Sequence, residues 1–370
     1  MKILVVLNDL DIGGAQNYTI ALINQFVGLG HDVNVVVLSE NLLLKDRLSA
    51  DVNVLVWKRR FKIDIAVLRK LRSEIVKGNY DGVISSYILY QKIATFGLSL
   101  PPLTLFPIHS TVDRDFKSFL VNFLLFRMKK KHERYVTSID CQTKYLCKKH
   151  LLRPDFFHQI YNGIDTEKFS KVQDQFSRNE FLKKIRVPVD YKIILMVAGF
   201  RGEKRHIDAF VAMKLLRSEM SKVTLICVGD NRKNERDKLQ NFIDEEGIEE
   251  VKLLIASEAG DVKNYYWSAD IFTLTSNKVE TFPISVIEAM ASGLPCVLTD
   301  TGGAKDIILN KKLGRIAPVE NVNAIAKAWK QVLKEYNSND KDFIRSYAKA
   351  HFQIKSSADQ YLNLLNKGKC

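Results

Sequence analysis

The chain has 370 residues, of which 46% are hydrophobic, and its formal net charge is +14. This length accommodates two domains of ordinary size, and the composition is that of a globular protein with sizeable cores. No apolar run approaches the roughly 18 residues of a membrane span, and the five cysteines lack the spacing of a zinc site or a disulfide framework. We therefore expect a protein that is not transmembrane and that works in a reducing, cytoplasmic setting.

The N-terminal residues predict the start of a doubly wound domain. Residues 2–8 are an apolar run that fits a buried strand better than the apolar core of a signal peptide. Gly13 and Gly14 follow in a turn that opens a helix to about Leu29, and residues 33–38 predict the next strand. The turn lacks the GxGxxG pattern, so NAD or FAD is not indicated, and its glycines can serve the tight turn alone.

His109 follows a short predicted strand at residues 103–106. Open α/β sheets place ligand contacts at the carboxyl ends of their strands. A lone histidine is more often structural, so position alone favours that interpretation. Two further strands are predicted at residues 52–56 and 82–85, with a helix over 63–77 between them.

The positive charge is concentrated in the first half of the chain. Residues 51–150 contain 19 Lys and Arg against 8 Asp and Glu. Within them, the segment Phe116–Arg134 predicts a helix with an apolar face next to Lys129–Lys131. The face consists of Phe116, Leu120, Phe123, Leu124 and Met128. Our first interpretation is that this face covers a sheet; the alternative is a helix that lies on an anionic membrane surface.

The pattern of strand and helix restarts in the second half. A strand at 134–139 and a helix at 142–150 precede an Asn-Gly turn, and the polar stretch 171–179 predicts a linker. A strand at 192–199 then leads to Arg201, Lys204 and Arg205 at the start of a helix over 206–217. Clustered cations at a helix start fit either a diphosphate site or a solvated charged loop. Later strands are predicted at 223–228, 251–255, 271–275 and 294–298, with a short helix at 261–267 and a helical tail at 342–365.

The most informative stretch is ETFPISVIEAMASG, residues 280–293. Pro283 suits the first position of a helix, and Gly293 suits a left-handed stop. The N–H groups around Pro283, Ile284 and Ser285 would form an anion site at the positive end of the helix dipole. Glu280 lies before this helix and Glu288 about one turn inside it, where their carboxylates can accept hydrogen bonds from sugar hydroxyls. The loop thus matches a nucleotide sugar, although Ser285 and Glu288 also have the spacing of a capping box.

The wider string resembles the donor-binding signature of retaining GT-B glycosyltransferases of the GT4 type (glycosyltransferase group 1 family). The string comprises Ser276, Glu280, Phe282, Glu288-Ala289-Met290-Ala291, Gly293, Pro295 and Gly302-Gly303. The resemblance implies an α/β protein with two Rossmann-like, doubly wound parallel-sheet domains that face a central cleft. The expected limits are 1–170 for an acceptor-binding domain, 171–345 for the nucleotide-sugar donor domain, and 346–370 for a C-terminal helix that crosses back to the first domain.

The resemblance also assigns roles to residues. The catalytic candidates are Glu280, His109, Lys204 and Arg201, and the donor-binding candidates are Gly13, Gly14, Arg201, Lys204, Glu280, Phe282, Pro283, Ile284, Ser285 and Glu288. Lys204, Arg201 and the helix amides would stabilise the departing β-phosphate, so no metal or other cofactor is expected. Gly199 stands where the family commonly has the arginine, which leaves open whether Arg201 or Arg205 takes that role.

The implied activity is that of a retaining hexosyltransferase. It would move a sugar, with a UDP-sugar favoured, to a saccharide or lipid-linked saccharide in cell-surface polysaccharide or lipopolysaccharide biosynthesis. Such an enzyme would be cytoplasmic and peripheral to the membrane, and no nucleic-acid partner is expected. Two alternatives remain: a sugar-nucleotide 2-epimerase of GT-B fold, which would need acid and base groups in the cleft, and a non-catalytic protein whose basic first domain binds a polyanion.

Overall fold

The computed structural model describes residues 1–11, 13–109, 115–170, 172, 175–231, 234–256, 260–277 and 280–367. The chain divides into two compact units. The first unit comprises Met1–Ile164 and Gln353–Cys370, and the second comprises Asp165–Phe352. The domain limits expected from the sequence, 170/171 and 345/346, lie near these junctions. They stay a prediction.

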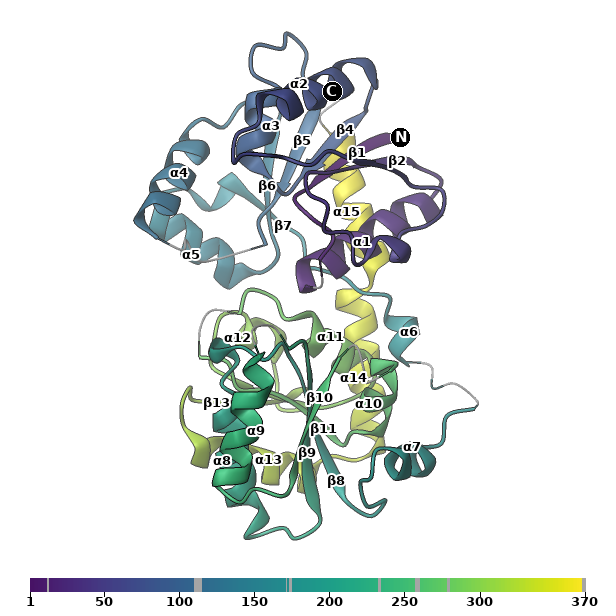
Figure 1. Cartoon of the computed structure of the whole chain (residues 1–370), viewed down its shortest axis with the longest axis vertical. Coiled ribbons are helices and arrows are strands. Elements are labelled where there is room, and N and C mark those ends of the chain that lie inside the picture. The colour runs from purple at the N-terminus through teal and green to yellow at the C-terminus, as the bar shows by residue number, and fades with distance from the viewer. Residues whose placement is uncertain are drawn as a thin grey trace. The chain divides into compact units, whose positions relative to one another are not determined.

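The first unit is built on a seven-stranded parallel sheet of order β3-β2-β1-β4-β5-β6-β7. Its strands are β1 (Lys2–Leu7), β2 (Asp32–Val37), β3 (Asn53–Val56), β4 (Gly82–Ser85), β5 (Leu103–Pro107), β6 (Glu133–Thr137) and β7 (Phe157–Gln159). Its helices are α1 (Gly14–Gly28), α2 (Ile65–Lys77), α3 (Ile88–Ala94), α4 (Phe116–Arg127), α5 (Asp140–His150) and α15 (Ile354–Asn366). The C-terminal helix α15 packs against α1 (Figure 1).

The second unit contains a six-stranded parallel sheet of order β10-β9-β8-β11-β12-β13. Its strands are β8 (Lys192–Val197), β9 (Val223–Gly229), β10 (Val251–Ile255), β11 (Ile271–Leu274), β12 (Cys296–Thr299) and β13 (Gly314–Ala317). Its helices are α6 (Thr166–Ser170), α7 (Arg178–Lys184), α8 (His206–Arg217), α9 (Glu235–Glu245), α10 (Val262–Ser268), α11 (Ile284–Ala291), α12 (Ala304–Ile307), α13 (Val322–Glu335) and α14 (Ser338–Phe352). In Figure 1, α8 and α9 lie on one side of the central strands and α10 and α14 on the other.

Continuous apolar runs produce both sheets. Every residue of β9 is buried, as expected for parallel strands that helices cover on both faces. The largest side chain of the second core, Trp329, is fully buried and donates its indole N–H to Thr273 Oγ1 at 3.0 Å. The predicted strands are confirmed with limits shifted by a residue or two. The edge strands β7 and β13 were not predicted, because β7 has only three residues and β13, with the sequence GRIA, has no continuous apolar run.

Two local expectations need correction. The tail does not form one helix over 342–365: α14 ends at Phe352 and α15 begins at Ile354, because Gln353 has extended backbone angles (φ −72°, ψ 132°). There the Ile354 N–H donates to the Ile164 carbonyl at 2.8 Å. The linker predicted over 171–179 is shorter than expected, since α7 already begins at Arg178; Lys171, Gln173 and Asp174 lie outside the described residues.

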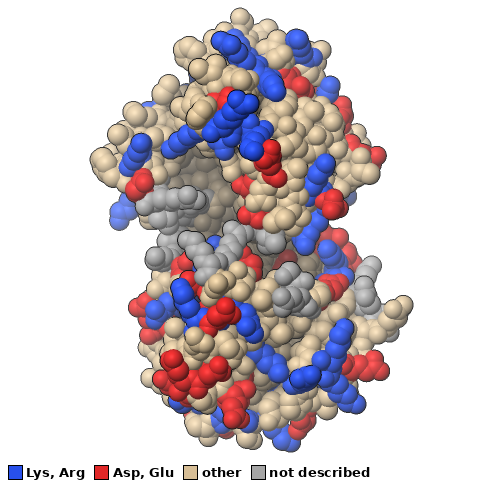
Figure 2. All heavy atoms as spheres, in the orientation of Figure 1, with Lys and Arg blue, Asp and Glu red and all other residues tan. Residues whose placement is uncertain are grey.

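The surface differs between the units. On the face in Figure 2, a band of Lys and Arg side chains crosses the first unit, while cations and anions alternate over the second. Within the described ranges, none of the helices combines the length and the apolar character that crossing a bilayer requires.

Candidate donor site in the second unit

The candidate site lies at the carboxyl ends of β8 and β11. These strands are neighbours, but the chain leaves β8 toward β9 and β10 and then returns to β11 on the other side of β8. Such a reversal of strand order is a topological switch point, where the loops after the two strands diverge and leave room for a ligand. The loops 198–205 and 275–283, which hold half of the predicted donor-binding residues, are those two loops.

A buried threonine ties the two loops together. Thr275, at the end of β11, donates its hydroxyl to the carbonyls of Lys204 at 3.0 Å and Arg205 at 2.9 Å. The Asn277 N–H adds a bond of 3.1 Å to the Glu203 carbonyl. The position of Lys204 is therefore fixed by backbone contacts as well as by its own side chain.

The Lys204 ammonium forms an ion pair with the Glu280 carboxylate. The side chains are only 15% and 17% exposed, so solvent screens this pair weakly. Ser276 donates its buried hydroxyl to Glu280 Oε1 at 2.6 Å, the same oxygen that Lys204 contacts. These contacts hold the Lys204 ammonium and the Glu280 carboxylate together, in a fixed orientation, at the switch point of the sheet.

The backbone of Glu280 is held by the glycine pair at 302–303. The Gly303 N–H donates to the Glu280 carbonyl at 3.0 Å. Gly302 has a φ of +47°, and a Cβ on it would lie 2.0 Å from the Glu280 carbonyl oxygen. Glycine is required here both for the left-handed conformation and for the close approach of the two segments.

Helix α11 begins one residue later than the sequence predicted. Pro283 is the N-cap, with φ −73° and ψ 109°, and not the first helical residue. The amides available for an anion are therefore those of Ile284 and Ser285, the first two helical residues, since proline has no N–H. The capping-box alternative is wrong, because Ser285 lies inside the helix and no side chain caps it. Gly293 has the predicted left-handed φ, +85°.

Glu288, one turn inside α11, is half-buried and bonded to a residue that sequence reasoning missed. Tyr266 of α10 donates its hydroxyl to Glu288 Oε2 at 2.7 Å. Phe282 was predicted to bind the donor. Its side chain is buried and packs edge-on against Phe352, with 5.7 Å between the ring centroids. Phe282 therefore anchors the loop before α11 in the core of the second unit.

The structure distinguishes the two arginines that the sequence left open. Arg205 has a left-handed backbone (φ 52°) and donates from Nε and one terminal nitrogen to the Asp208 carboxylate at 3.0 and 2.7 Å. Arg201 is more exposed and contacts Glu203 only at 3.7 Å. Its guanidinium lies back over Gly199, with nitrogens 3.1 Å from the place of a Cβ there. Arg201 thus brings its charge to position 199, whereas Arg205 is engaged in a local pair.

A buried histidine supports the loop after β8 from behind. His206, the first residue of α8, is 2% exposed and hydrogen-bonds to the backbone of Ala198. Burial, together with the nearby Lys204 charge, lowers the pKa of His206 to about 3. The imidazole is therefore neutral throughout the physiological range and adds no charge to the site.

In the first unit, the predicted residues occupy the corresponding edge of the other sheet. Gly13 is the N-cap of α1 with φ −178°, an extended conformation open to any residue, and Gly14 is exposed as the first helical residue. His109 follows β5, is half-buried and packs edge-on against Tyr18 at 6.3 Å. Desolvation lowers the pKa of His109 to about 4, so this imidazole too is neutral.

The apolar face of α4 does not pack as predicted. Phe116, Leu120, Leu124 and Met128 are exposed by 45% to 77%. The packed side is the opposite one, where Leu125 and Phe126 are buried. Phe126 lies edge-on to the rings of Tyr135, Phe156, Phe157 and His150, with centroids 5.0 to 5.8 Å apart. This aromatic cluster decides which side of α4 is covered.

The described part of the chain contains no group of three His, Cys, Asp or Glu side chains that could hold a metal ion. The site residues that sequence reasoning missed act through side-chain hydroxyls. They are Tyr266, Thr275 and Thr299, and the Thr299 hydroxyl donates to the Ser276 carbonyl at 2.5 Å. They belong to no motif, and only their partners in the fold mark them.

Comparison with known proteins agrees with this geometry. The family model "Glycosyl transferases group 1" matches residues 177–350, and "Glycosyltransferase Family 4" matches residues 12–168. Together the two models cover most of both units. The chain belongs to the group 1 glycosyltransferase family.

Among individual relatives, an uncharacterized glycosyltransferase of Methanocaldococcus jannaschii is 30% identical over 54% of this chain. The N-acetyl-alpha-D-glucosaminyl L-malate synthase of Bacillus anthracis is 26% identical over 55% of this chain. The matches span about half the length of these curated relatives, 50% and 51% respectively.

Solved structures match the chain over almost its whole length. A glycosyltransferase of Rickettsia africae superposes with a TM-score of 0.85 at 18% identity and covers 99% of this chain and 98% of its own. Anabaena HepE in complex with UDP superposes with a TM-score of 0.84 at 17% identity, covering 99% and 100%. HepE has also been solved with UDP-glucose. These likenesses show that the fold is the two-domain α/β GT-B fold.

Proposed function

We propose that this protein transfers a sugar from a nucleotide sugar to a saccharide or lipid-linked saccharide acceptor in cell-surface polysaccharide or lipopolysaccharide biosynthesis. The observation that carries the proposal is the Lys204–Glu280–Ser276 cluster next to the start of α11, at the switch point of the second sheet. A largely buried cation, an oriented carboxylate and the amides of a helix start are what a sugar bonded to a diphosphate requires.

The chemical task is to break the anomeric C–O bond while negative charge builds on the diphosphate. Lys204, Arg201 and the N–H groups of Ile284 and Ser285 would stabilise that charge, which is the main contribution a fixed site can make to such a step. Because these groups supply the positive charge, we propose that the reaction needs no metal. Arg201 would take the arginine role, since Arg205 is engaged with Asp208.

The remaining groups would bind hydroxyls. Glu280, whose Oε1 is held by Lys204 and Ser276, would accept from hydroxyls of the transferred sugar, and Glu288 would accept from the ribose. His109, neutral at working pH, would contact the transferred sugar as a hydrogen-bond partner. We further propose retention of configuration, with the leaving phosphate taking the proton of the acceptor.

A UDP-sugar is our proposed donor. HepE, which shares the fold at 17% identity, has been solved with UDP and with UDP-glucose. This supports a uridine nucleotide.

A thermal-shift screen of UDP, GDP, ADP and their sugars tests the proposal. One nucleotide should stabilise the wild type, and Glu288→Ala should reduce that shift, while Glu246→Ala, on a surface glutamate paired with Lys214, should not. NMR analysis of the products would show the anomeric configuration, and incubation without acceptor would reveal an epimerase. If no nucleotide stabilised the wild type, the transferase proposal would fail in favour of polyanion binding.

We also propose that α4 contacts an anionic membrane surface. Its outer side exposes Phe116, Leu120, Val121, Leu124 and Met128, with Lys117 and Arg127 on the same helix. Such a mixture of apolar and cationic side chains is typical of helices at the membrane interface. It would bring the enzyme to a lipid-linked acceptor.

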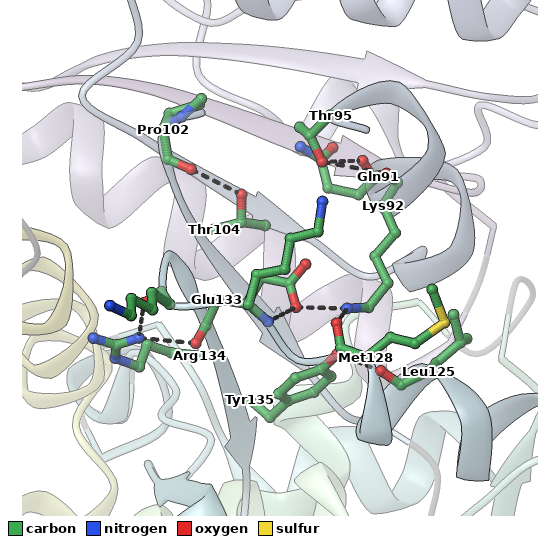
Figure 3. A network of polar contacts seen from close by, with 12 residues as sticks. Gln91, Lys92, Thr95, Pro102, Thr104, Leu125, Met128, Glu133, Arg134 and Tyr135 are labelled. Atoms are coloured by element: carbon green, nitrogen blue, oxygen red, sulfur yellow. Dashed lines mark hydrogen bonds and ion pairs between the residues drawn. The ribbon is translucent and has the colours of Figure 1, made fainter. Parts of the chain in front are cut away.

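A buried network holds the end of α4 in place (Figure 3). Lys92 donates to Glu133 Oε2 at 2.5 Å and to the Met128 carbonyl at 3.0 Å, and the Lys130 N–H donates to the same carboxylate oxygen at 3.0 Å. Of the predicted basic cluster, Lys129 bonds to the Phe156 carbonyl and Lys130 lies over the Phe96 ring. The apolar face is therefore expected to contribute more to membrane binding than Lys129 does.

Co-sedimentation with vesicles containing phosphatidylglycerol tests this contact. Leu120→Glu with Leu124→Glu should abolish binding at low salt, and the exposed Leu309→Glu of the second unit should leave it intact. Binding that survives the double substitution would rule out α4 as the contact.

A further inference from the structure

We infer that Tyr266 is a positioning residue for nucleotide recognition: its hydroxyl orients Glu288 toward the ribose and so sets the preference for a nucleotide with ribose hydroxyls. This inference rests on the proposed function. It concerns a residue outside the donor-binding string, on a different helix from Glu288.

Tyr266 is fully buried in the core of the second unit. Its ring lies edge-on to Phe169 at 5.7 Å and tilted against Phe272 at 6.0 Å. The hydroxyl emerges from this apolar environment at the first turns of α11, 2.7 Å from Glu288 Oε2 and 3.4 Å from the Ser285 carbonyl. The ring is thus fixed on its faces, and its one polar atom is directed at the carboxylate.

The contact is a strong one for physical reasons. A phenol that donates to a carboxylate makes a charge-assisted hydrogen bond, about twice as strong as a neutral one. Burial and the Glu288 charge raise the pKa of Tyr266 well above its ordinary value, so the phenol keeps its proton and remains a donor at any working pH. Packing alone does not explain the hydroxyl, because phenylalanine would fill the same apolar space.

The consequence concerns orientation. A glutamate on a helix can take several rotamers, and Glu288 is half-buried rather than enclosed. The bond from Tyr266 selects one of them before the nucleotide arrives. Without it, the carboxylate would be held less firmly in that rotamer, and the contact with the ribose hydroxyls would weaken. Lys204, held by Thr275 and Glu280, would be unaffected, so the diphosphate should bind as before.

This difference between ribose and diphosphate gives a specific experiment. UDP, GDP and ADP are titrated into the wild type by calorimetry, and the tightest of them is then compared with its 2′,3′-dideoxy form. The wild type should prefer the ribonucleotide by roughly 10- to 100-fold, the range for hydrogen bonds to a charged group. Tyr266→Phe should lower that preference by about tenfold, with little change in affinity for the dideoxy form, and Glu288→Ala should remove it.

Tyr265→Phe is the matched control. It makes the same chemical change on the neighbouring residue, whose ring packs against Phe181 at 4.9 Å, and it should keep the wild-type preference. A structural effect of Tyr266→Phe would weaken both nucleotides equally and leave their ratio unchanged, which would overturn the inference while the transferase proposal stands. If none of the nucleotides bound the wild type, the proposed function would fail and the inference with it.

Discussion

The two sheets of this protein share a topology but differ in chemistry at the same edge. Each has a switch point beside its first strand, between β1 and β4 in the first unit and between β8 and β11 in the second. In the second unit that edge holds a largely buried ion pair, the Ser276 hydroxyl that orients it, and the start of α11. In the first, the predicted residues are a glycine turn and a neutral His109 that contacts Tyr18. The fold thus fixes where a ligand can bind, and the loop residues decide what it is.

The comparison also explains why the family motif is concentrated in the second half. Binding a diphosphate needs charges at fixed positions, and each charge needs partners that hold it. Lys204, Glu280 and Ser276 form such a set, and their spacing in sequence follows from the loops that carry them. Under the proposed function the first unit would bind the saccharide acceptor, and hydroxyl groups place fewer demands on any single residue than a diphosphate does.

The largest expected effect separates the two edges directly. Lys204→Ala removes the buried cation and leaves Glu280 without its ion-pair partner, so kcat/KM should fall about 1000-fold, in the range for loss of a major electrostatic contact. His109→Gln in the first unit should cost about tenfold. Steady-state kinetics with the identified donor provide the measurement, and Lys214→Ala, a surface lysine on α8, is the control. Equal losses of kcat/KM for Lys204→Ala and His109→Gln would contradict the difference between the two sheet edges.

The buried histidine of the second unit predicts a pH dependence of stability. The pKa of His206 is about 3 when folded and about 6.5 when unfolded, so the unfolded state binds more protons below pH 6.5. The stability that neutral His206 confers is fully present above pH 6.5 and is lost as the pH falls toward 3. Between pH 7 and pH 4 this loss amounts to about 3 kcal/mol.

Urea unfolding at the two pH values measures this loss. Trp267 and Trp329 lie in the second unit and Trp57 in the first, so fluorescence in a Trp57→Phe background reports on the second unit. His206→Gln in that background should flatten the pH dependence. An unchanged dependence would show that other groups cause it.

The glycine beside Glu280 offers an intermediate effect. Gly302→Ala and Gly247→Ala both place a Cβ on a left-handed residue, with φ +47° and +62°. Gly247→Ala should cost about 1 kcal/mol of stability, and Gly302→Ala should cost more. Only at Gly302 does the Cβ meet the Glu280 carbonyl, whereas nothing lies within 4 Å at Gly247. Gly302→Ala should therefore also lower donor turnover by at least about tenfold. Equal turnover in the two variants would contradict the role of Gly302 in holding Glu280.

The smallest effect compares the two arginines. Arg201→Gln should raise the Kd for the nucleoside diphosphate by about fivefold to tenfold, since it removes one exposed charge from the phosphate. It should leave the Tm close to that of the wild type. Arg205→Gln breaks the pair with Asp208 and should instead lower the Tm with a smaller effect on Kd. Calorimetry gives the Kd of both variants, and thermal unfolding gives their Tm. A larger rise in Kd for Arg205→Gln than for Arg201→Gln would assign the phosphate contact to Arg205.

The sequence predicted the sheets well because parallel strands are continuous apolar runs between turn residues, as in residues 192–197. It also predicted the helix between Pro283 and Gly293, to within one residue at its start, because the start and stop signals are close in sequence. It did not predict the contact of Tyr266 with Glu288, which are 22 residues apart and belong to different helices. Nor did it predict which side of α4 packs, because both sides are apolar and distant aromatic rings decide between them.

The most direct test of the account is a crystal structure of the wild type with UDP, or with whichever nucleoside diphosphate stabilises it most. We predict a diphosphate within hydrogen-bond distance of the Lys204 ammonium and the Ile284 and Ser285 amides, and a ribose on the Glu288 carboxylate that Tyr266 holds. A nucleotide bound elsewhere, with the Lys204–Glu280 cluster and the start of α11 making no contact with it, would contradict the central claim.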